Sequence, residues 1–146
     1  MILKFKKLNP DAMIPKHSRE GDAAMDIFSA EELVIKPGKR ALVHTDVAIE
    51  ISNGWCGLVL PRSGNAINKG VTVMNSPGLI DSNYRGEIMI GLINTDKLNA
   101  FIIQKGDRIA QLLITRALST SEIQVEVTNE LSASNRGTQG FGSSGR

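Results

Sequence analysis

The sequence contains one cysteine, few aromatic residues and no long apolar run. A single cysteine, Cys56, cannot form an intrachain disulfide, so we expect a reducing compartment, most simply the cytoplasm. Aromatic residues make up only 4% of the chain, which predicts an aliphatic core. No apolar stretch approaches the roughly 18 residues of a membrane span, and lysines interrupt the apolar residues of the first segment, which argues against a secretory signal. A net charge of +2 is too small to indicate nucleic acid or an anionic membrane as a partner.

Two common kinds of site also lack their sequence signals. His17 and His44 are far apart, and neither has a second His or Cys at a metal-ligand spacing, so no zinc site is predicted. No Gly-x-x-x-x-Gly-Lys-Ser/Thr phosphate loop occurs. The 146 residues are enough for one domain with one core, and no second domain is expected.

Turn signals recur about every ten residues, and no segment shows a sustained 3.6-residue apolar repeat, which predicts an all-β sandwich or barrel of short strands. Asn53-Gly54 predicts a tight hairpin between the strands on either side of it. Met25, Met74 and Met89 lie in strand-like runs and are expected to fill the core. One helical turn is expected at 66–70. The expected strands are 2–8, 25–28, 32–35, 40–51, 55–60, 71–74, 87–93, 100–103, 108–115 and 123–127.

The end of the chain differs from the rest in composition. Residues 129–146 hold only Leu131 and Phe141 as large apolar side chains and are rich in glycine and serine, so they cannot fold alone. We therefore predict a β-domain over 1–128 and a flexible glycine-rich arm over 129–146. The arm is either a plain low-complexity end or a segment that wraps an anion with backbone amides while Phe141 stacks on a flat ligand.

The stretch 71–94 is the first candidate for chemistry. Asn75-Ser76-Pro77-Gly78 is a turn signature, and Asp81 follows two apolar residues on a short loop held by strands on both sides. A carboxylate placed in this way suits an acid or base. A β-hairpin with a solvated loop Asp fits the same residues.

Two further segments carry weaker signals. Arg62-Ser63-Gly64 lies where a strand gives way to a polar corner, and such a corner either binds an anion or is a surface turn. Gln111 interrupts the apolar run 109–114, and a buried amide needs partners, so Gln111 bonds either to the backbone or to a ligand. Cys56, beside Trp55 in a strand, is predicted to be a buried apolar group rather than a nucleophile.

Taken together, a set of segments in a fixed order resembles the trimeric dUTPase (dUTP diphosphatase) family over nearly the whole chain. The segments are A-A-M-D-I-F-S-A (23–30), P-R-S-G-N-A (61–66), N-S-P-G-L-I-D-S-N-Y-R-G-E (75–87), G-D-R-I-A-Q-L-L-I (106–114) and R-G-T-Q-G-F-G-S-S-G (136–145). The resemblance implies a jelly-roll-like β-barrel that assembles as a homotrimer. It also implies active sites at the subunit junctions, with the C-terminal arm exchanged onto a neighbouring subunit.

The activity that this resemblance implies is hydrolysis of dUTP to dUMP and pyrophosphate with Mg²⁺, which limits uracil incorporation into DNA and supplies dUMP for dTMP synthesis. Asp81 corresponds to the residue that activates water for attack on the α-phosphorus. Asp26 corresponds to a carboxylate that helps hold the metal's water shell or the catalytic region, and Gln111 to a contact near the α-phosphate. Mg²⁺ is expected to be held mainly by the substrate phosphates and by water, with Asp26 as a candidate outer-shell contact.

The resemblance assigns the remaining candidates to parts of the substrate. Most of these residues would bind the phosphates, the polar edge of uracil or the deoxyribose, or would belong to the closing arm. Tyr84 would lie under the sugar and exclude a 2′-hydroxyl. The implied substrate-binding residues are Arg62, Ser63, Gly64, Asn75, Gly78, Leu79, Ile80, Tyr84, Met89, Arg136, Phe141, Gly142, Ser143 and Ser144.

Two alternatives stay open on the same fold. A dCTP deaminase would need a catalytic Glu beside the base, where this sequence presents Asp81 and Asn75. A non-catalytic dUTP-binding regulatory protein would bind dUTP without releasing pyrophosphate.

Overall fold

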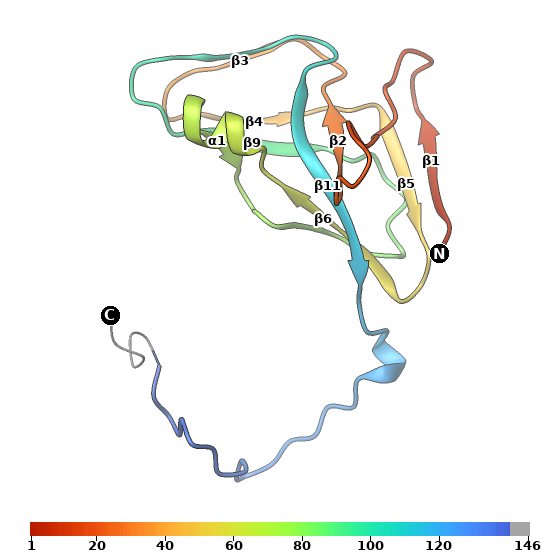
Figure 1. Cartoon of the computed structure of the whole chain (residues 1–146), viewed down its shortest axis with the longest axis vertical. Helices are drawn as coiled ribbons and strands as arrows, with labels where there is room; N and C mark the ends of the chain where they lie inside the picture. The colour runs from red at the N-terminus through yellow and green to blue at the C-terminus, as the bar shows by residue number, and fades with distance from the viewer. Residues whose placement is uncertain (141–146) are drawn as a thin grey trace.

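The computed structural model describes residues 1–140, which form short β-strands joined by turns (Figure 1). One helix, α1 (Ser63–Lys69), follows β6, and a 3₁₀ turn at Thr120–Glu122 follows the last strand. The strands are β1 (Leu3–Lys7), β2 (Ala24–Phe28), β3 (Leu33–Ile35), β4 (Arg40–Val43), β5 (Val47–Ile51), β6 (Trp55–Leu60), β7 (Val71–Val73), β8 (Gly78–Ile80), β9 (Ile90–Asn94), β10 (Phe101–Ile103) and β11 (Arg108–Arg116). The prediction of an all-β fold of short strands is confirmed.

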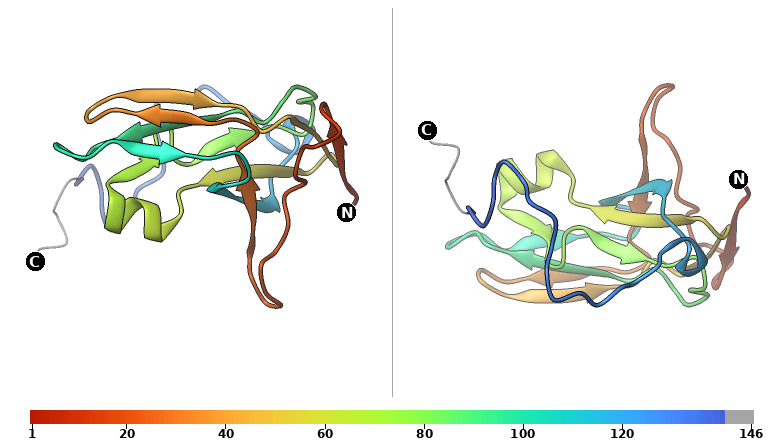
Figure 2. Two further views of the ribbon diagram at one scale, coloured as in Figure 1. Left: turned by 90° about the horizontal axis from the view of Figure 1, so that it is seen from above. Right: turned by 90° about the horizontal axis from the view of Figure 1, so that it is seen from below.

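All strand pairs are antiparallel, and within residues 1–140 they form four hydrogen-bonded sheets rather than one continuous ladder. The sheets have the orders β2–β11–β6–β8, β4–β9–β7, β1–β5 and β10–β3. Figure 2 shows the strands lying in layers, with α1 at the end of the body opposite to the N-terminus. Among the described strands β8 is an edge strand, since it pairs with β6 alone, and it lies in the chain between Asn75 and Asp81.

The core between the sheets is aliphatic, as the shortage of aromatic residues predicts. Side chains from most strands contribute, and Cys56 is buried among them as expected. Met25 is also buried, but Met74 and Met89 are 50% and 41% exposed, so the prediction that they fill the core is wrong. The largest fully buried apolar side chains are Ile27, Ile35, Ile90, Leu92, Ile103, Ile109, Leu112, Val43, Val47 and Val71.

The predicted strand pairing around 71–94 is partly confirmed. The strands β7 and β9 pair antiparallel, with Val71 opposite Asn94 and Val73 opposite Leu92. The segment between them is more than a turn, because its first part forms β8, which crosses to β6 in another sheet. The Asn53-Gly54 turn is present, but β5 and β6 on either side of it belong to different sheets, so no hydrogen-bonded hairpin forms there.

Four predicted elements differ from the structure. The strand predicted at 87–93 begins only at Ile90. The run 40–51 is broken into β4 and β5 at Asp46, which has a positive φ of 55°, a conformation that Asp tolerates better than most residues. The helix begins at Ser63 rather than at residue 66. The predicted strand 123–127 is absent because no other described segment pairs with it, and its side chains are exposed.

After β11 the chain leaves the body of the domain, and Figure 1 shows the segment that follows running away from the sheets in an extended path. Residues 123–140 contain no helix or strand, and residues 121–140 are exposed throughout. The domain boundary at residue 128 stays a prediction. Within residues 1–140, no helix has the length and apolar character needed to cross a membrane.

Candidate active site

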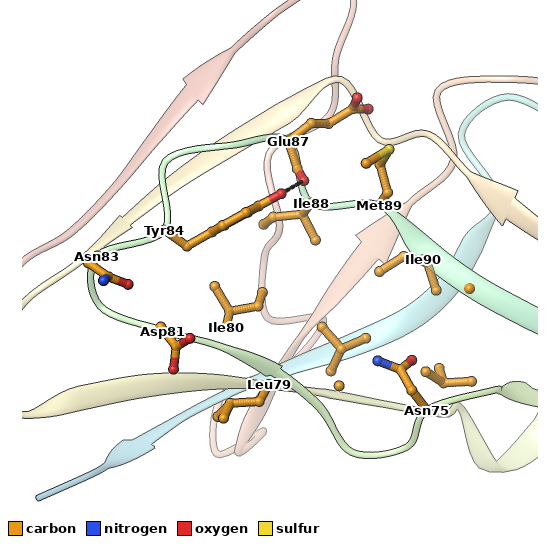
Figure 3. A pocket seen from close by; sticks show the side chains of 14 residues that line it. Asn75, Leu79, Ile80, Asp81, Asn83, Tyr84, Glu87, Ile88, Met89 and Ile90 are labelled. Atoms are coloured by element: carbon orange, nitrogen blue, oxygen red, sulfur yellow. Dashed lines mark hydrogen bonds between the residues drawn. The ribbon is translucent and has the colours of Figure 1, made fainter.

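The segment between β7 and β9 forms one wall and the floor of a pocket of about 290 Å³ (Figure 3). Asn75 lines one side, β8 the floor, and Asp81 and Tyr84 the other side. Because β8 pairs only with β6 among the described strands, the backbone groups of its other edge are free to bind a ligand. The sequence-predicted residues Asn75, Asp81 and Tyr84 are therefore brought together, and Met89 lines the same pocket.

Gly78 lets the Asn75 amide approach β8 closely. A Cβ atom at position 78 would lie 3.3 Å from Asn75 Nδ2 and 3.3 Å from Val59 Cβ. This contact places the amide beside the edge of β8, so an amide donor and acceptor stand next to backbone donors and acceptors. Such an arrangement suits the polar edge of a planar base.

Tyr84 is held by the segment that follows it. Its hydroxyl donates a hydrogen bond of 2.7 Å to the backbone carbonyl of Glu87, which Figure 3 shows as a dashed line. The ring crosses Gly86 so closely that a Cβ atom there would lie 2.6 Å from the Tyr84 Oη. The ring is 39% exposed, and its free face is available to a ligand in the pocket.

A second group of predicted residues lies in a different depression. Asp26, Arg62 and Gln111 line it, together with Ser18 and Arg19 from the loop before β2. Strand pairing brings them together, because Gln111 of β11 lies opposite Asp26 of β2 and opposite Leu60 of β6. Ser63 and Gly64 are exposed in the first turn of α1, directly after Arg62.

Asp26 is 4% exposed and fully committed to neighbouring groups. Its carboxylate accepts a hydrogen bond of 2.6 Å from the Ser18 hydroxyl and one of 3.1 Å from Arg62 Nε, and Arg108 Nη1 lies 3.5 Å away. Burial by itself raises the pKa of Asp26, but the Ser18 hydrogen bond and the charges of Arg62 and Arg108 together outweigh it and lower the pKa below its ordinary value of 3.8. Asp26 is therefore an ionised anchor that fixes the orientation of Arg62.

The two groups do not meet within one chain. Successive residues of a strand point to opposite faces, so on β6 Val59 faces the first pocket while Leu60 lines the second depression. No residue lines both of them. The pocket with Asp81 and the depression with Arg62 are thus two separate surfaces of one chain.

The described arm residues, 129–140, do not line either surface. Arg136 is exposed, and its Nε donates a hydrogen bond of 2.9 Å to the backbone carbonyl of Gln139. The predicted ligands Phe141, Gly142, Ser143 and Ser144 lie outside the described residues.

The donor groups present fit a magnesium ion that is held mainly by its substrate. Residues 1–140 contain no cluster of three or more His, Cys, Asp or Glu side chains that could enclose a metal ion. Both oxygens of Asp26 are already engaged by Ser18 and two arginines. Mg²⁺ keeps several waters and commonly binds through substrate phosphates with few carboxylates, so these residues are compatible with it.

A dUTPase family model matches residues 10–145. The chain belongs to the dUTPase family. It is 46% identical to a deoxyuridine 5′-triphosphate nucleotidohydrolase of Mycobacterium marinum, over 98% of this chain and 94% of that protein, and 43% identical to one of Thermobifida fusca, over 98% and 78%.

Solved dUTPase structures share the fold. The dUTPase of Staphylococcus bacteriophage 80alpha with dUPNHPP has a TM-score of 0.91 and 32% identity, covering 99% of both chains. A mutant dUTPase of phage phi11 of S. aureus, whose structure shows a coordinated structural Mg(II) ion, has a TM-score of 0.81 and 26% identity, covering 91% of this chain and 100% of that one. The recognition made from the sequence segments is thus confirmed.

Sequence reasoning missed the groups that hold the predicted residues in place. Ser18 and Arg108 fix Asp26, and the Glu87 backbone holds Tyr84. Nothing in the loop 9–21 marks Ser18. The signal for Arg108 was its place at the start of β11, three residues before Gln111, but only the sheet pairing shows that it reaches Asp26.

Proposed function

We propose that the protein hydrolyses dUTP to dUMP and pyrophosphate. The single observation that carries the proposal is that Asn75, the free edge of β8, Tyr84 and Asp81 line one pocket, with Asn75 on one side and Tyr84 and Asp81 on the other. The relatives named as deoxyuridine triphosphate nucleotidohydrolases support this activity rather than deamination of dCTP.

The edge of β8 and the Asn75 amide would read uracil. Cytosine carries an amino group where uracil has a carbonyl, so it would leave a donor of the site unpaired, and such a mismatch discriminates by about 10⁴-fold or more. Thymine would be excluded by size, because its 5-methyl group has to fit against the same closely packed segment. The backbone groups of Gly78, Leu79 and Ile80 would contact the base directly, and they can approach it more closely than side chains could.

Tyr84 would lie against the deoxyribose. Its hydroxyl is bound to the Glu87 carbonyl, so the ring cannot turn away to admit an extra 2′-hydroxyl group. This restraint favours dUTP over UTP. Met89, on the opposite side of the pocket, would complete the apolar lining.

Asp81 would act as the general base. Its exposed carboxylate follows β8 directly and lines the pocket, so it can hold a water molecule near the α-phosphorus of a bound nucleotide. The water oxygen bonds to the α-phosphorus, the bond from that phosphorus to the oxygen bridging to the β-phosphorus breaks, and the water proton passes to Asp81. The pyrophosphate leaves with the electron pair of the broken bond.

The phosphates would be bound by Arg62, Ser63, Gly64 and Gln111. Arg62 and Gln111 lie on a separate surface of the chain, and Ser63 and Gly64 follow Arg62 directly, so a complete site requires Asp81 of one subunit to face Gln111 of another. This supports a homotrimer with active sites at subunit junctions. Mg²⁺, bound through the phosphates and water, would neutralise charge on the leaving pyrophosphate, with Asp26 as an outer-shell neighbour.

The arm would close the site. Residues 129–146 would cross to a neighbouring subunit, where Arg136, Ser143 and Ser144 bind the γ-phosphate while Phe141 and Gly142 cover the base. Closure of this kind excludes water other than the attacking molecule. The β-domain over 1–128 would keep its fold with or without this step.

A pyrophosphate-release assay tests the proposal. We expect release from dUTP with Mg²⁺, very little from UTP, dTTP or dCTP, and a severe loss of activity with a chelator. Ammonia release from dCTP would instead indicate a deaminase, and tight dUTP binding without pyrophosphate release would indicate a regulatory binding protein.

A further inference from the structure

Glu87 links the candidate pocket to the turn between β4 and β5. Its Oε1 accepts hydrogen bonds of 3.0 Å from the backbone N–H of Thr45 and 2.9 Å from that of Asp46, and its Oε2 lies 3.0 Å from His44 Nδ1. Figure 3 shows the Glu87 carboxylate directed away from the pocket that its backbone lines. The side chain therefore binds the turn between β4 and β5, and the main chain belongs to the pocket wall.

The main chain around Glu87 completes this connection. The Glu87 carbonyl accepts the Tyr84 hydroxyl, the Ile88 N–H donates a 2.8 Å hydrogen bond to the Val47 carbonyl, and the Thr45 hydroxyl donates one of 2.6 Å to the Ile88 carbonyl. The wall that positions Tyr84 is thus attached to residues 45–47 by two hydrogen bonds of the Ile88 main chain and by the Glu87 carboxylate. Asp46, whose φ is positive, is the last residue of this turn, and its backbone N–H donates to the Glu87 carboxylate.

The charge of Glu87 suits this attachment. Burial alone raises the pKa of the Glu87 carboxyl, but the N–H groups of Asp46 and Thr45 and the His44 side chain outweigh it and lower the pKa below 4.5. The carboxylate is thus ionised at neutral pH, where hydrogen bonds from backbone N–H groups to a charged acceptor are strongest. His44 is about half-exposed and adds an ion pair at the surface, which contributes little by itself.

We propose that Glu87 is a positioning residue for dUTP: its carboxylate, without touching the substrate, holds the 84–88 wall against the 44–46 turn and so fixes the Tyr84 ring against the sugar. This inference rests on the proposed function of the pocket. It assigns to Glu87 a role in substrate affinity, since Tyr84 contacts the bound nucleotide and not the attacking water.

The experiment compares Glu87→Ala with Glu87→Gln and His44→Ala. Removing the acceptor in Glu87→Ala should raise KM for dUTP about tenfold and leave kcat within about twofold. The amide oxygen of Glu87→Gln can still accept the two N–H groups, so that variant should restore most of the affinity. His44→Ala removes only the exposed partner and should behave as the wild type.

Tyr84 is the only tyrosine in the sequence, which gives a direct view of the ring. Labelling with 3-fluorotyrosine yields one ¹⁹F resonance, and Glu87→Ala should shift or broaden it while Glu87→Gln and His44→Ala leave it in place. Ile103→Val, a buried change in β10 outside the pocket, serves as a stability control and should lower Tm without moving KM or the resonance.

If Glu87→Ala does not fold, Glu87→Asp replaces it, because the shorter side chain keeps the charge but does not reach the turn. If KM for dUTP and the ¹⁹F resonance are both unchanged in Glu87→Ala (or in Glu87→Asp where that variant replaces it), the inference is overturned. It is also overturned if Ile103→Val changes KM and the resonance as much as that variant does. Failure of the wild type to release pyrophosphate from dUTP would instead refute the proposed function, and the resonance would still report whether Glu87 positions Tyr84.

Discussion

Replacing Gly86 by alanine places a methyl group against the Tyr84 ring. The new Cβ atom would lie 2.6 Å from the Tyr84 Oη, 2.8 Å from Cζ and 3.1 Å from Cε2. Comfortable contacts between such atoms are about 3.5 Å, so the ring has to move by about 1 Å. The ring is the end of a partly exposed side chain and can move, which makes this a change of position rather than a failure to fold.

The expected effects on stability and on activity follow from the contacts that the Tyr84 ring loses. Moving it breaks the 2.7 Å hydrogen bond to the Glu87 carbonyl, which contributes about 0.5–1.5 kcal/mol to stability. The larger effect is on the nucleotide, because a displacement of about 1 Å in a positioning group can reduce kcat/KM by up to about 10²-fold. Space opened beside the sugar should at the same time weaken discrimination against UTP.

Steady-state pyrophosphate release with dUTP and with UTP measures both effects. Tyr84→Phe is the matched comparison, because it removes the hydrogen bond to the Glu87 carbonyl without adding a group that pushes the ring aside. We expect kcat/KM for dUTP to fall about 10- to 100-fold in Gly86→Ala, with a reduced dUTP/UTP ratio, and to fall less in Tyr84→Phe. A Gly86→Ala protein with the wild-type dUTP/UTP ratio would refute the role given to Tyr84.

Three other changes test separate parts of the site. Asp81→Asn should lower kcat about 10²- to 10⁴-fold in a pyrophosphate assay with little change in dUTP affinity, and near-normal kcat would remove Asp81 as the base. Asp26→Asn leaves Arg62 and Arg108 without their shared carboxylate and should cost about 2 kcal/mol of unfolding free energy at pH 7 in urea titrations. The pKa of Asp26 is lowered in the folded protein, so its contribution to the unfolding free energy is present above pH 3.8 and is lost as the pH falls through the folded-state pKa. The difference in unfolding free energy between Asp26→Asn and the wild type should therefore shrink below pH 3.8. A difference that stays constant with pH would contradict the pairing of Asp26 with the arginines. Deleting residues 136–146 should leave the urea midpoint unchanged, since residues 136–140 are exposed, but should reduce kcat/KM at least about 10²-fold, and full activity would contradict the lid.

The sequence predicts best what lies close together along the chain. Asn75, Asp81 and Tyr84 share one loop, so turn signals and flanking strands were enough to group them. The pairing of β7 with β9 follows from the same local pattern. The Asn53-Gly54 turn shows the limit, because turn chemistry fixes how the chain reverses but not which strands it then joins.

Contacts between distant segments could not be derived from local patterns. Asp26 meets Arg62 and Arg108 only through the β2–β11–β6 pairing, and the resemblance alone indicated that Asp26 and Arg62 share a site. It meets Ser18 because the loop before β2 folds back on that strand at the Lys16–Asp26 bridge. The predicted strand 123–127 has the right composition, yet pairing requires a partner edge, and the described part of the chain offers none. An alternation of apolar and polar residues shows which face a strand would bury, but it does not show that another strand is there to pair with it.

In the proposed homotrimer, Asp81 and Gln111 act together only across a subunit boundary. Asp81→Asn and Gln111→Ala variants, each nearly inactive alone, can be co-expressed so that mixed assemblies form. In randomly mixed trimers some sites combine an intact Asp81 with an intact Gln111, and pyrophosphate release from dUTP should recover to about a quarter of the wild-type rate. If the mixture stays as inactive as its two parents, the two surfaces do not form one site between subunits.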